Sequence, residues 1–204
     1  MKILGLTGGI GTGKSTAAAM LRRMGVAVFD ADAAVHRLLG PGGAAVQDVA
    51  KAFPGALKAG AIDRAALGAT VFADKAALKR LEAILHPLVR VQERLFLKTQ
   101  RAHRARVAVL DIPLLYETGR DKNCDAVAVI WAPGFLQRAR VLSRPGMSQD
   151  RFAAILAQQH PIHYKRSRAD FSVPSGLGRA VTWRALTSCL ERLRACGDKS
   201  GGAE

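Results

Sequence analysis

The sequence predicts an α/β domain built on a parallel β-sheet, and two observations lead to this fold class. Short apolar runs, each typical of a strand, alternate along the chain with segments whose apolar residues recur at helical spacing. The run at 126–131 is continuously apolar, as expected for a parallel strand buried on both faces. The apolar runs together predict a five-stranded sheet with strands at 3–7, 26–29, 106–111, 126–131 and 169–173.

Helices are predicted between and after these strands. Gly25 fits the position just after the end of the first helix, and Ser148 is a suitable N-cap for a later one. The stretch 112–117 is expected to form a loop or a short helix. The predicted helices cover residues 14–24, 33–39, 133–142, 148–159 and 179–195.

Residues 44–105 are almost wholly helical in pattern. Asp63 and Asp74 suit the N-caps of two helices, and Pro87 suits the first turn of a third helix that runs to about residue 104. A helical insertion of this size is too long for a simple crossover between two strands. The sequence therefore predicts a separate helical subdomain within one chain.

Composition excludes several classes of protein. The 204 residues are 49% hydrophobic, enough for one domain with insertions. The chain has no apolar run of the ~18 residues that a membrane span needs, and its N-terminus has no signal-peptide pattern, so a cytoplasmic protein without membrane contact is expected. The three scattered cysteines are expected to be thiols rather than disulfides or metal ligands.

The formal net charge of +15 is compatible with a nucleic acid partner, a polyanionic small substrate or a solvated arginine-rich surface. The basic residues spread through both halves, with a local excess around 138–168. Aromatic residues do not alternate with them as base-stacking platforms would. Nucleic acid is therefore not expected as the physiological partner, and a monomer or weak homo-oligomer is expected.

A glycine-rich turn joins the first predicted strand to the first helix. It matches the phosphate-binding pattern G-x-x-x-x-G-K-[ST], in which glycines let backbone N–H groups approach phosphate oxygens. Lys14 can reach the β- and γ-phosphates, and the Ser15 hydroxyl can bind Mg²⁺. The predicted nucleotide-binding residues are Gly8, Gly9, Gly11, Thr12, Gly13, Lys14, Ser15 and Thr16.

Two acids also follow predicted strands, and carboxyl ends of parallel strands meet at one edge of the sheet. Asp111 resembles the acid that holds Mg²⁺ directly or through water; a turn acid or N-cap is the alternative. Asp32 can orient an acceptor hydroxyl and take its proton. It equally suits the N-cap of the helix at 33–39, and Asp30 is an alternative functional acid.

A basic segment at 137–168 points to phosphoryl transfer. In kinases, mobile arginines close over the triphosphate and exclude water, which favours a small-molecule kinase here. The alternative is a solvated arginine face. The segment holds Arg138, Arg140, Arg144, Arg151, Lys165, Arg166 and Arg168 against the single acid Asp150.

Several motifs together resemble the dephospho-coenzyme A kinase family. Residues 6–16, LTGGIGTGKST, are similar to the family's LTGGIGSGKST. Asp30–Asp32 matches its DAD, Leu85–Pro87 its L-H-P, and Asp111–Glu117 its less common D-x-P-L-L-[FY]-E. The similarity extends from residue 2 to about 176 and includes Gln137, Gln159, Lys165 and Asp170.

The resemblance implies ATP-dependent phosphorylation of the ribose 3′-hydroxyl of dephospho-coenzyme A, the last step of coenzyme A synthesis. Another small-metabolite or nucleotide kinase is the alternative, and a nucleic-acid-binding P-loop NTPase is a further one. The implied fold is a three-layer P-loop NTPase core with a helical acceptor-binding insertion and a small helical lid. Approximate bounds are 1–31, 106–136 and 169–196 for the core, 32–105 for the insertion and 137–168 for the lid.

By position, the resemblance implies that Asp32 is the general base. It also implies that Lys14 and Arg140 bind the ATP phosphates and hold the transferring phosphoryl group. It gives His86 to acceptor binding, although the residue alone reads as one packed inside the subdomain. The sequence departs from the family at Thr12, where serine is usual, which is harmless if that position supplies mainly its backbone N–H. It departs again at 173–176, which has no asparagine, so no side-chain contact is assigned in that loop.

Overall fold

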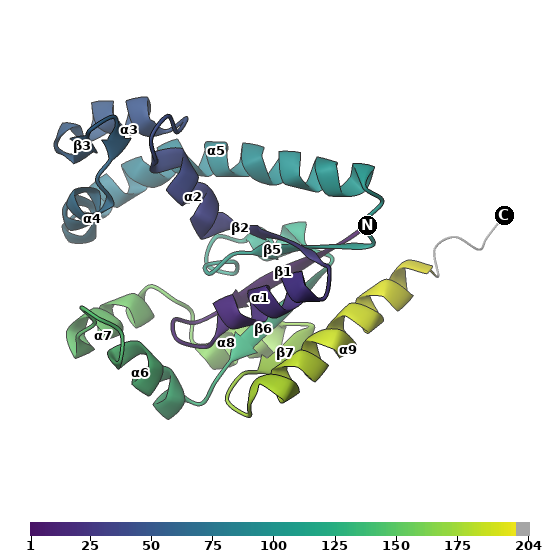
Figure 1. Ribbon diagram of the computed structural model, residues 1–204. Helices are drawn as coiled ribbons and strands as arrows, with labels where there is room; N and C mark the ends of the chain where they lie inside the picture. Colours follow the sequence, from purple (N-terminus) through teal and green to yellow (C-terminus); the bar gives the residue numbers. More distant parts are fainter. Residues whose placement is uncertain (199–204) are drawn as a thin grey trace. The chain divides into compact units, whose positions relative to one another are not determined.

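The computed structural model describes residues 1–198, with only the backbone described for Phe72, Ala73 and residues 196–198. The described chain forms two compact units (Figure 1). One unit combines Met1–Phe29 with the chain from Gln100 onward, and the other is Asp30–Thr99.

A five-stranded sheet is the centre of the first unit, in the order β2-β5-β1-β6-β7 (Figure 1). β1 runs parallel to β5 and to β6, and β6 runs parallel to β7, which confirms the predicted parallel sheet. The strands are β1 (Lys2–Gly8), β2 (Ala27–Asp30), β5 (Val107–Asp111), β6 (Ala126–Trp131) and β7 (Phe171–Pro174).

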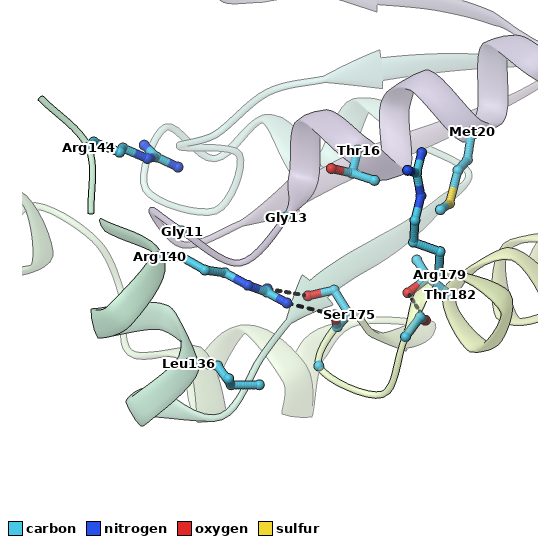
Figure 2. A pocket seen from close by; sticks show the side chains of 12 residues that line it. Gly11, Gly13, Thr16, Met20, Leu136, Arg140, Arg144, Ser175, Arg179 and Thr182 are labelled. Atoms are coloured by element: carbon cyan, nitrogen blue, oxygen red, sulfur yellow. Dashed lines mark hydrogen bonds between the residues drawn. The ribbon is translucent and has the colours of Figure 1, made fainter. Parts of the chain in front are cut away.

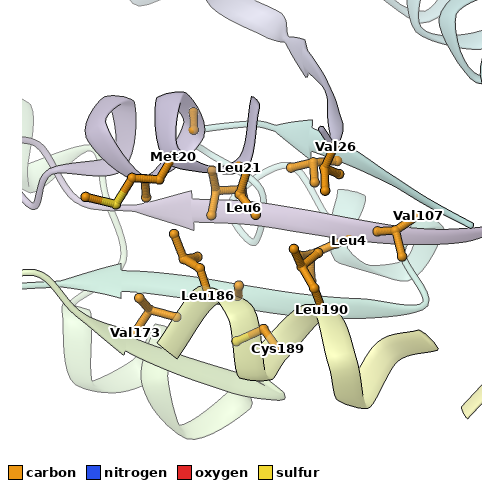
Figure 3. Close-up of a cluster of buried hydrophobic side chains, with 14 of the residues drawn as sticks. Leu4, Leu6, Met20, Leu21, Val26, Val107, Val173, Leu186, Cys189 and Leu190 are labelled. Atoms are coloured by element: carbon orange, nitrogen blue, oxygen red, sulfur yellow. The ribbon is translucent and has the colours of Figure 1, made fainter. Parts of the chain in front are cut away.

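Successive side chains of a strand point to opposite faces of this sheet, and different segments of the chain pack on the two faces. On one face, Leu4 and Leu6 of β1 are fully buried with Leu21 of α1 and Leu186 of α9, as Figure 3 shows. On the other face, a Cβ added to Gly5 would lie 2.9 Å from the side chains of Leu115 and Cys124. The segment after β5 therefore packs on that second face, and the sheet is buried on both sides.

The helices of the first unit fall close to their predicted positions, and the Ser148 hydroxyl accepts from the Arg151 N–H as the predicted N-cap. One helix, α8, was not predicted, because its seven residues are mostly polar and basic and show no apolar residues at helical spacing. The helices are α1 (Lys14–Arg23), α6 (Gly134–Leu142), α7 (Gln149–Ala157), α8 (Ile162–Arg168) and α9 (Arg179–Asp198), with a 3₁₀ turn, η2, at Arg120–Asn123.

The second unit is helical apart from one small hairpin. Asp63 caps α4 and Asp74 caps α5, both as predicted. The hairpin of β3 and β4 was not predicted; its turn places Ala59 at φ 48° and Gly60 at φ 76°. The elements are α2 (Ala31–Leu39), α3 (Val46–Ala52), η1 (Pro54–Ala56), β3 (Leu57–Lys58), β4 (Ala61–Ile62), α4 (Arg64–Ala73) and α5 (Lys75–Ala102).

The predicted break at Pro87 is wrong, because α5 is one helix of 28 residues with Pro87 inside it. An interior proline removes one backbone hydrogen bond and costs about 3 kcal/mol. The buried side chains Leu81, Leu85 and Val89 lie on one face of the helix on both sides of the proline. Burial of that continuous apolar face offsets the cost.

Within residues 1–198, no helix combines the length and apolar character needed to cross a membrane. Cys124 and Cys189 are thiols, as predicted. The side chain of Cys196, to which the same prediction applied, lies outside the described part of the chain.

Candidate active site

The predicted phosphate-binding turn connects the end of β1 at Gly8 to the start of α1 at Lys14. Gly13 is the N-cap of α1 with φ 87°, a left-handed conformation that a residue with a Cβ rarely adopts. Thr12 donates to the Gly9 carbonyl from its N–H at 3.3 Å and from its hydroxyl at 2.8 Å. The Thr12 side chain therefore braces the turn from inside, and a serine would offer the same hydroxyl.

The structure brings together two predicted site residues, Lys14 and Asp111. The Lys14 Nζ lies 2.5 Å from the Asp111 Oδ1, and their side chains are only 15% and 3% exposed. β5 ends at Asp111 beside β1, whereas Lys14 opens α1. Ser15 and Thr16 follow on the first turn of α1 and are exposed.

A cavity of about 620 Å³ opens beside this turn (Figure 2). Three arginines line it and none of the described lining residues is acidic, so its charge complements an anion. The lining residues are Gly11, Gly13, Thr16, Met20, Leu136, Arg140, Arg144, Ser175, Gly176, Gly178, Arg179 and Thr182.

Arg140 and Ser175 point toward one another in this cavity, as Figure 2 shows. The Arg140 guanidinium donates to the Ser175 hydroxyl at 3.2 Å and to its carbonyl at 3.0 Å. The Ser175 hydroxyl in turn donates to the Thr12 carbonyl. Ser175 therefore links Arg140 to the phosphate-binding turn, a contact within the protein that the sequence did not predict.

Sequence reasoning missed much of the cavity wall. Met20, Leu136, Arg179 and Thr182 come from α1, α6 and α9, and no motif connects them. One signal was available for Ser175. It directly follows β7, at the same carboxyl edge of the sheet where the phosphate-binding turn lies.

Two further predicted site residues, Asp32 and His86, belong to the second unit. Asp32 is exposed in the first turn of α2, which begins at Ala31. The N-cap is Asp30, whose carboxylate accepts from the Ala33 N–H at 2.9 Å, so the alternative of Asp32 as N-cap is wrong. His86 is exposed on α5, which contradicts its alternative reading as a packed residue.

Residues 2–176 match the family model described as dephospho-CoA kinase. The chain belongs to the dephospho-CoA kinase family. A dephospho-CoA kinase of Paramagnetospirillum magneticum is 64% identical over 166 residues, which cover 81% of this chain and 78% of that protein.

Two solved structures resemble the whole fold of this family member. A Thermus thermophilus protein is 36% identical with a TM-score of 0.80, over 94% of this chain and 97% of that one. The dephospho-CoA kinase of Campylobacter jejuni is 26% identical with a TM-score of 0.63, also over 94% and 97% of the two chains.

The dephospho-CoA kinase signature at Asp111–Glu117 ends in a buried ion pair. The Glu117 Oε1 lies 2.7 Å from the Nζ of Lys165, whose side chain is fully buried. Lys165 also donates to the Pro113 carbonyl at 3.3 Å, and the His160 N–H donates to the Glu117 Oε1 at 2.7 Å. The signature thus attaches the segment after β5 to α8 and to the chain just before it.

The electrostatics of Glu117 follow from these contacts. Burial raises the pKa of the carboxyl, but hydrogen bonds from Lys165 and from the His160 N–H, with the Lys165 charge, outweigh burial and hold the pKa below 4.5. Because the folded-state pKa is depressed, the stabilisation is complete above pH 4.5 and is lost as pH falls through the folded-state value.

Glu117→Gln is therefore expected to lower the free energy of unfolding at pH 7 by about 3–5 kcal/mol, since it leaves the buried Lys165 ammonium unpaired. Urea unfolding at pH 7 and at pH 4 measures the free energy of unfolding. The difference in this free energy between wild type and variant should be smaller at pH 4. The matched control is Glu191→Gln at an exposed position of α9. A gap that stays constant with pH would contradict the ion-pair assignment.

Proposed function

We propose that this chain transfers the γ-phosphoryl group of ATP to the ribose 3′-hydroxyl of dephospho-CoA, the final step of coenzyme A biosynthesis. The match of residues 2–176 to the dephospho-CoA kinase family carries this proposal. The phosphate-binding turn and the arginine-lined cavity beside it support the donor half of the reaction.

On the donor side, the turn from Gly8 to Thr16 binds the triphosphate through backbone N–H groups and the positive end of α1. Lys14 neutralises charge on the β- and γ-phosphates, and the close contact with Asp111 orients its ammonium group. Arg140, whose guanidinium donates to Ser175, adds a second cation for the transferring group.

Mg²⁺ fits the residues present. This ion prefers oxygen ligands and usually binds through one or two carboxylates together with substrate phosphates and water. Ser15 and Asp111 supply a hydroxyl and a carboxylate, and the described chain contains no larger cluster of acidic, histidine or cysteine ligands. When bound, Mg²⁺ would neutralise phosphate charge that develops during transfer.

On the acceptor side, Asp32 accepts the proton of the 3′-hydroxyl as that oxygen attacks phosphorus, and ADP leaves. His86 and the surrounding helical insertion at 32–105 bind the acceptor, whereas residues 137–168 form a lid that excludes water. The core comprises residues 1–31, 106–136 and 169–196. The protein works in the cytoplasm, as a monomer or weak homo-oligomer, without membrane or nucleic acid as a partner.

The test is a coupled assay of ADP release from purified protein with Mg²⁺-ATP and a panel of acceptors. Dephospho-CoA should give ADP well above the no-acceptor background, and the phosphorus spectrum of the product should show a 3′-phosphate. EDTA should abolish the reaction and excess Mg²⁺ should restore it. The proposal is wrong if another metabolite or a nucleotide is phosphorylated and dephospho-CoA is not, or if only nucleic acid stimulates hydrolysis.

A further inference from the structure

Two glutamines contact the backbone of one residue at the top of the phosphate-binding turn. The Gln137 Nε2 donates to the Ile10 carbonyl at 2.7 Å. The Gln159 Oε1 accepts from the Ile10 N–H at 3.0 Å. Both polar groups of the Ile10 backbone are therefore bonded to side chains that lie far along the chain from it.

These two bonds determine how the adjacent peptide groups point. In a planar trans peptide, the N–H and the C=O point in opposite directions. Because the Ile10 carbonyl points to Gln137, the N–H of Gly11 in the same peptide group points away from Gln137. Because the Ile10 N–H points to Gln159, the Gly9 carbonyl points the other way, where Thr12 donates to it twice.

Two glycines of the turn lie against the segments that carry Gln137 and Gln159. A Cβ at Gly9 would lie 3.1 Å from the Gln137 Nε2 and 3.4 Å from the Gln159 Oε1. A Cβ at Gly11 would lie 2.5 Å from a methyl group of Val141 and 2.9 Å from the Gln137 carbonyl. Glycine is thus needed at position 11, where α6 packs on the turn, whereas a side chain at position 9 would displace the two glutamine side chains by a few tenths of an ångström.

Both glutamines are themselves held in place. Gln137 lies on α6, one turn before Arg140. Gln159 follows the end of α7, and the next residue, His160, donates its N–H to Glu117 of the buried ion pair. The contact to Ile10 therefore extends a network that already joins the segment after β5 to α8.

We propose that Gln137 and Gln159 are positioning residues that hold the two peptide groups beside Ile10, so that the Gly11 N–H faces the phosphates and the Gly9 carbonyl does not. The inference rests on the proposed function only in that the turn binds a nucleoside triphosphate. Each lost hydrogen bond should weaken binding of the phosphates and leave binding of the nucleoside unchanged.

The experiment measures binding of Mg²⁺-ATP and of adenosine by titration calorimetry to Gln137→Ala, Gln159→Ala and the control Gln158→Ala, an exposed neighbour. The first two variants should bind Mg²⁺-ATP roughly 3–10-fold more weakly, the loss of one neutral hydrogen bond, with adenosine affinity unchanged. The control should match wild type. Unchanged Mg²⁺-ATP affinity in both variants, or an equal loss for adenosine, would overturn the inference.

A second pair of variants separates hydrogen bonding from charge. Gln159→Glu keeps an acceptor for the Ile10 N–H, whereas Gln137→Glu places a carboxylate against the Ile10 carbonyl. Both add one negative charge beside the same residue, so Gln137→Glu should bind Mg²⁺-ATP more weakly than Gln159→Glu. Equal affinities would count against the inference. None of these measurements uses dephospho-CoA, so a failed acceptor assay and a failed positioning role remain distinguishable.

Discussion

Asp32→Asn is expected to lower the turnover of dephospho-CoA phosphorylation by roughly 10²–10⁴-fold, the range for loss of a general base. The amide has nearly the shape of the carboxylate but cannot accept the proton of the attacking hydroxyl. Asp32 is exposed and is not the N-cap of α2, so the fold should tolerate the change. Steady-state kinetics measures turnover, and thermal unfolding with Mg²⁺-ATP titration checks that folding and donor binding are intact.

Asp30→Asn is the matched control, two residues away. Asn and Asp are about equally good N-caps, so this variant should keep the bond to the Ala33 N–H and near-normal turnover. If Asp30→Asn abolishes turnover while Asp32→Asn does not, the base is Asp30. If neither variant slows transfer, the acceptor is activated without a carboxylate from this segment.

Lys14→Ala is expected to have two separable effects. Transfer should fall by roughly 10²–10³-fold, the cost of removing one charged group that stabilises the developing phosphate charge. The protein should also lose about 3 kcal/mol of stability, because the Asp111 carboxylate, 3% exposed, loses the cation 2.5 Å away. Acceptor-dependent ADP release and urea unfolding measure the two effects.

The double variant Lys14→Ala/Asp111→Asn tells the two effects apart. Neutralising Asp111 removes the buried charge that has lost its contact with Lys14, so the double variant should recover part of the stability lost by Lys14→Ala. Its transfer rate should stay low, since Lys14 and the proposed Mg²⁺ ligand are both absent. Recovery of transfer together with stability would mean that Lys14 acts only as a structural partner of Asp111.

Much of the core could be predicted from the sequence because its signals are local. The strand at 126–131 is recognisable from its apolar character alone, and the turn from Gly8 to Ser15 from its spacing. The β3–β4 hairpin was missed because strands of two residues have no period. The prediction of a helix boundary at Pro87 was wrong because burial of the apolar face on both sides of Pro87 outweighs the helix-breaking effect of the proline.

Site residues could be predicted where they belong to a local sequence motif. Contacts between segments far apart in the sequence could not. The D-A-D stretch offers two acids within one turn, and only the start of α2 decides that Asp30 is the cap. Ser175 contacts Thr12 across 163 positions of sequence, and no local pattern encodes such a contact. No local pattern encodes the contacts of Gln137 and Gln159 either. Gln137 lies on α6 and Gln159 follows α7, and both side chains bond to the backbone of Ile10.

The link between Thr12 and Ser175 has a consequence for the order of events during synthesis. β1 leaves the ribosome well before both of its neighbours in the sheet, since β5 and β6 begin more than a hundred residues after the start of β1. Ser175, which fastens the nucleotide turn to β7, emerges later still. Nascent chains that end before β7 should therefore lack a competent nucleotide site, so ATP can stabilise this protein only after β7 and Ser175 have left the ribosome.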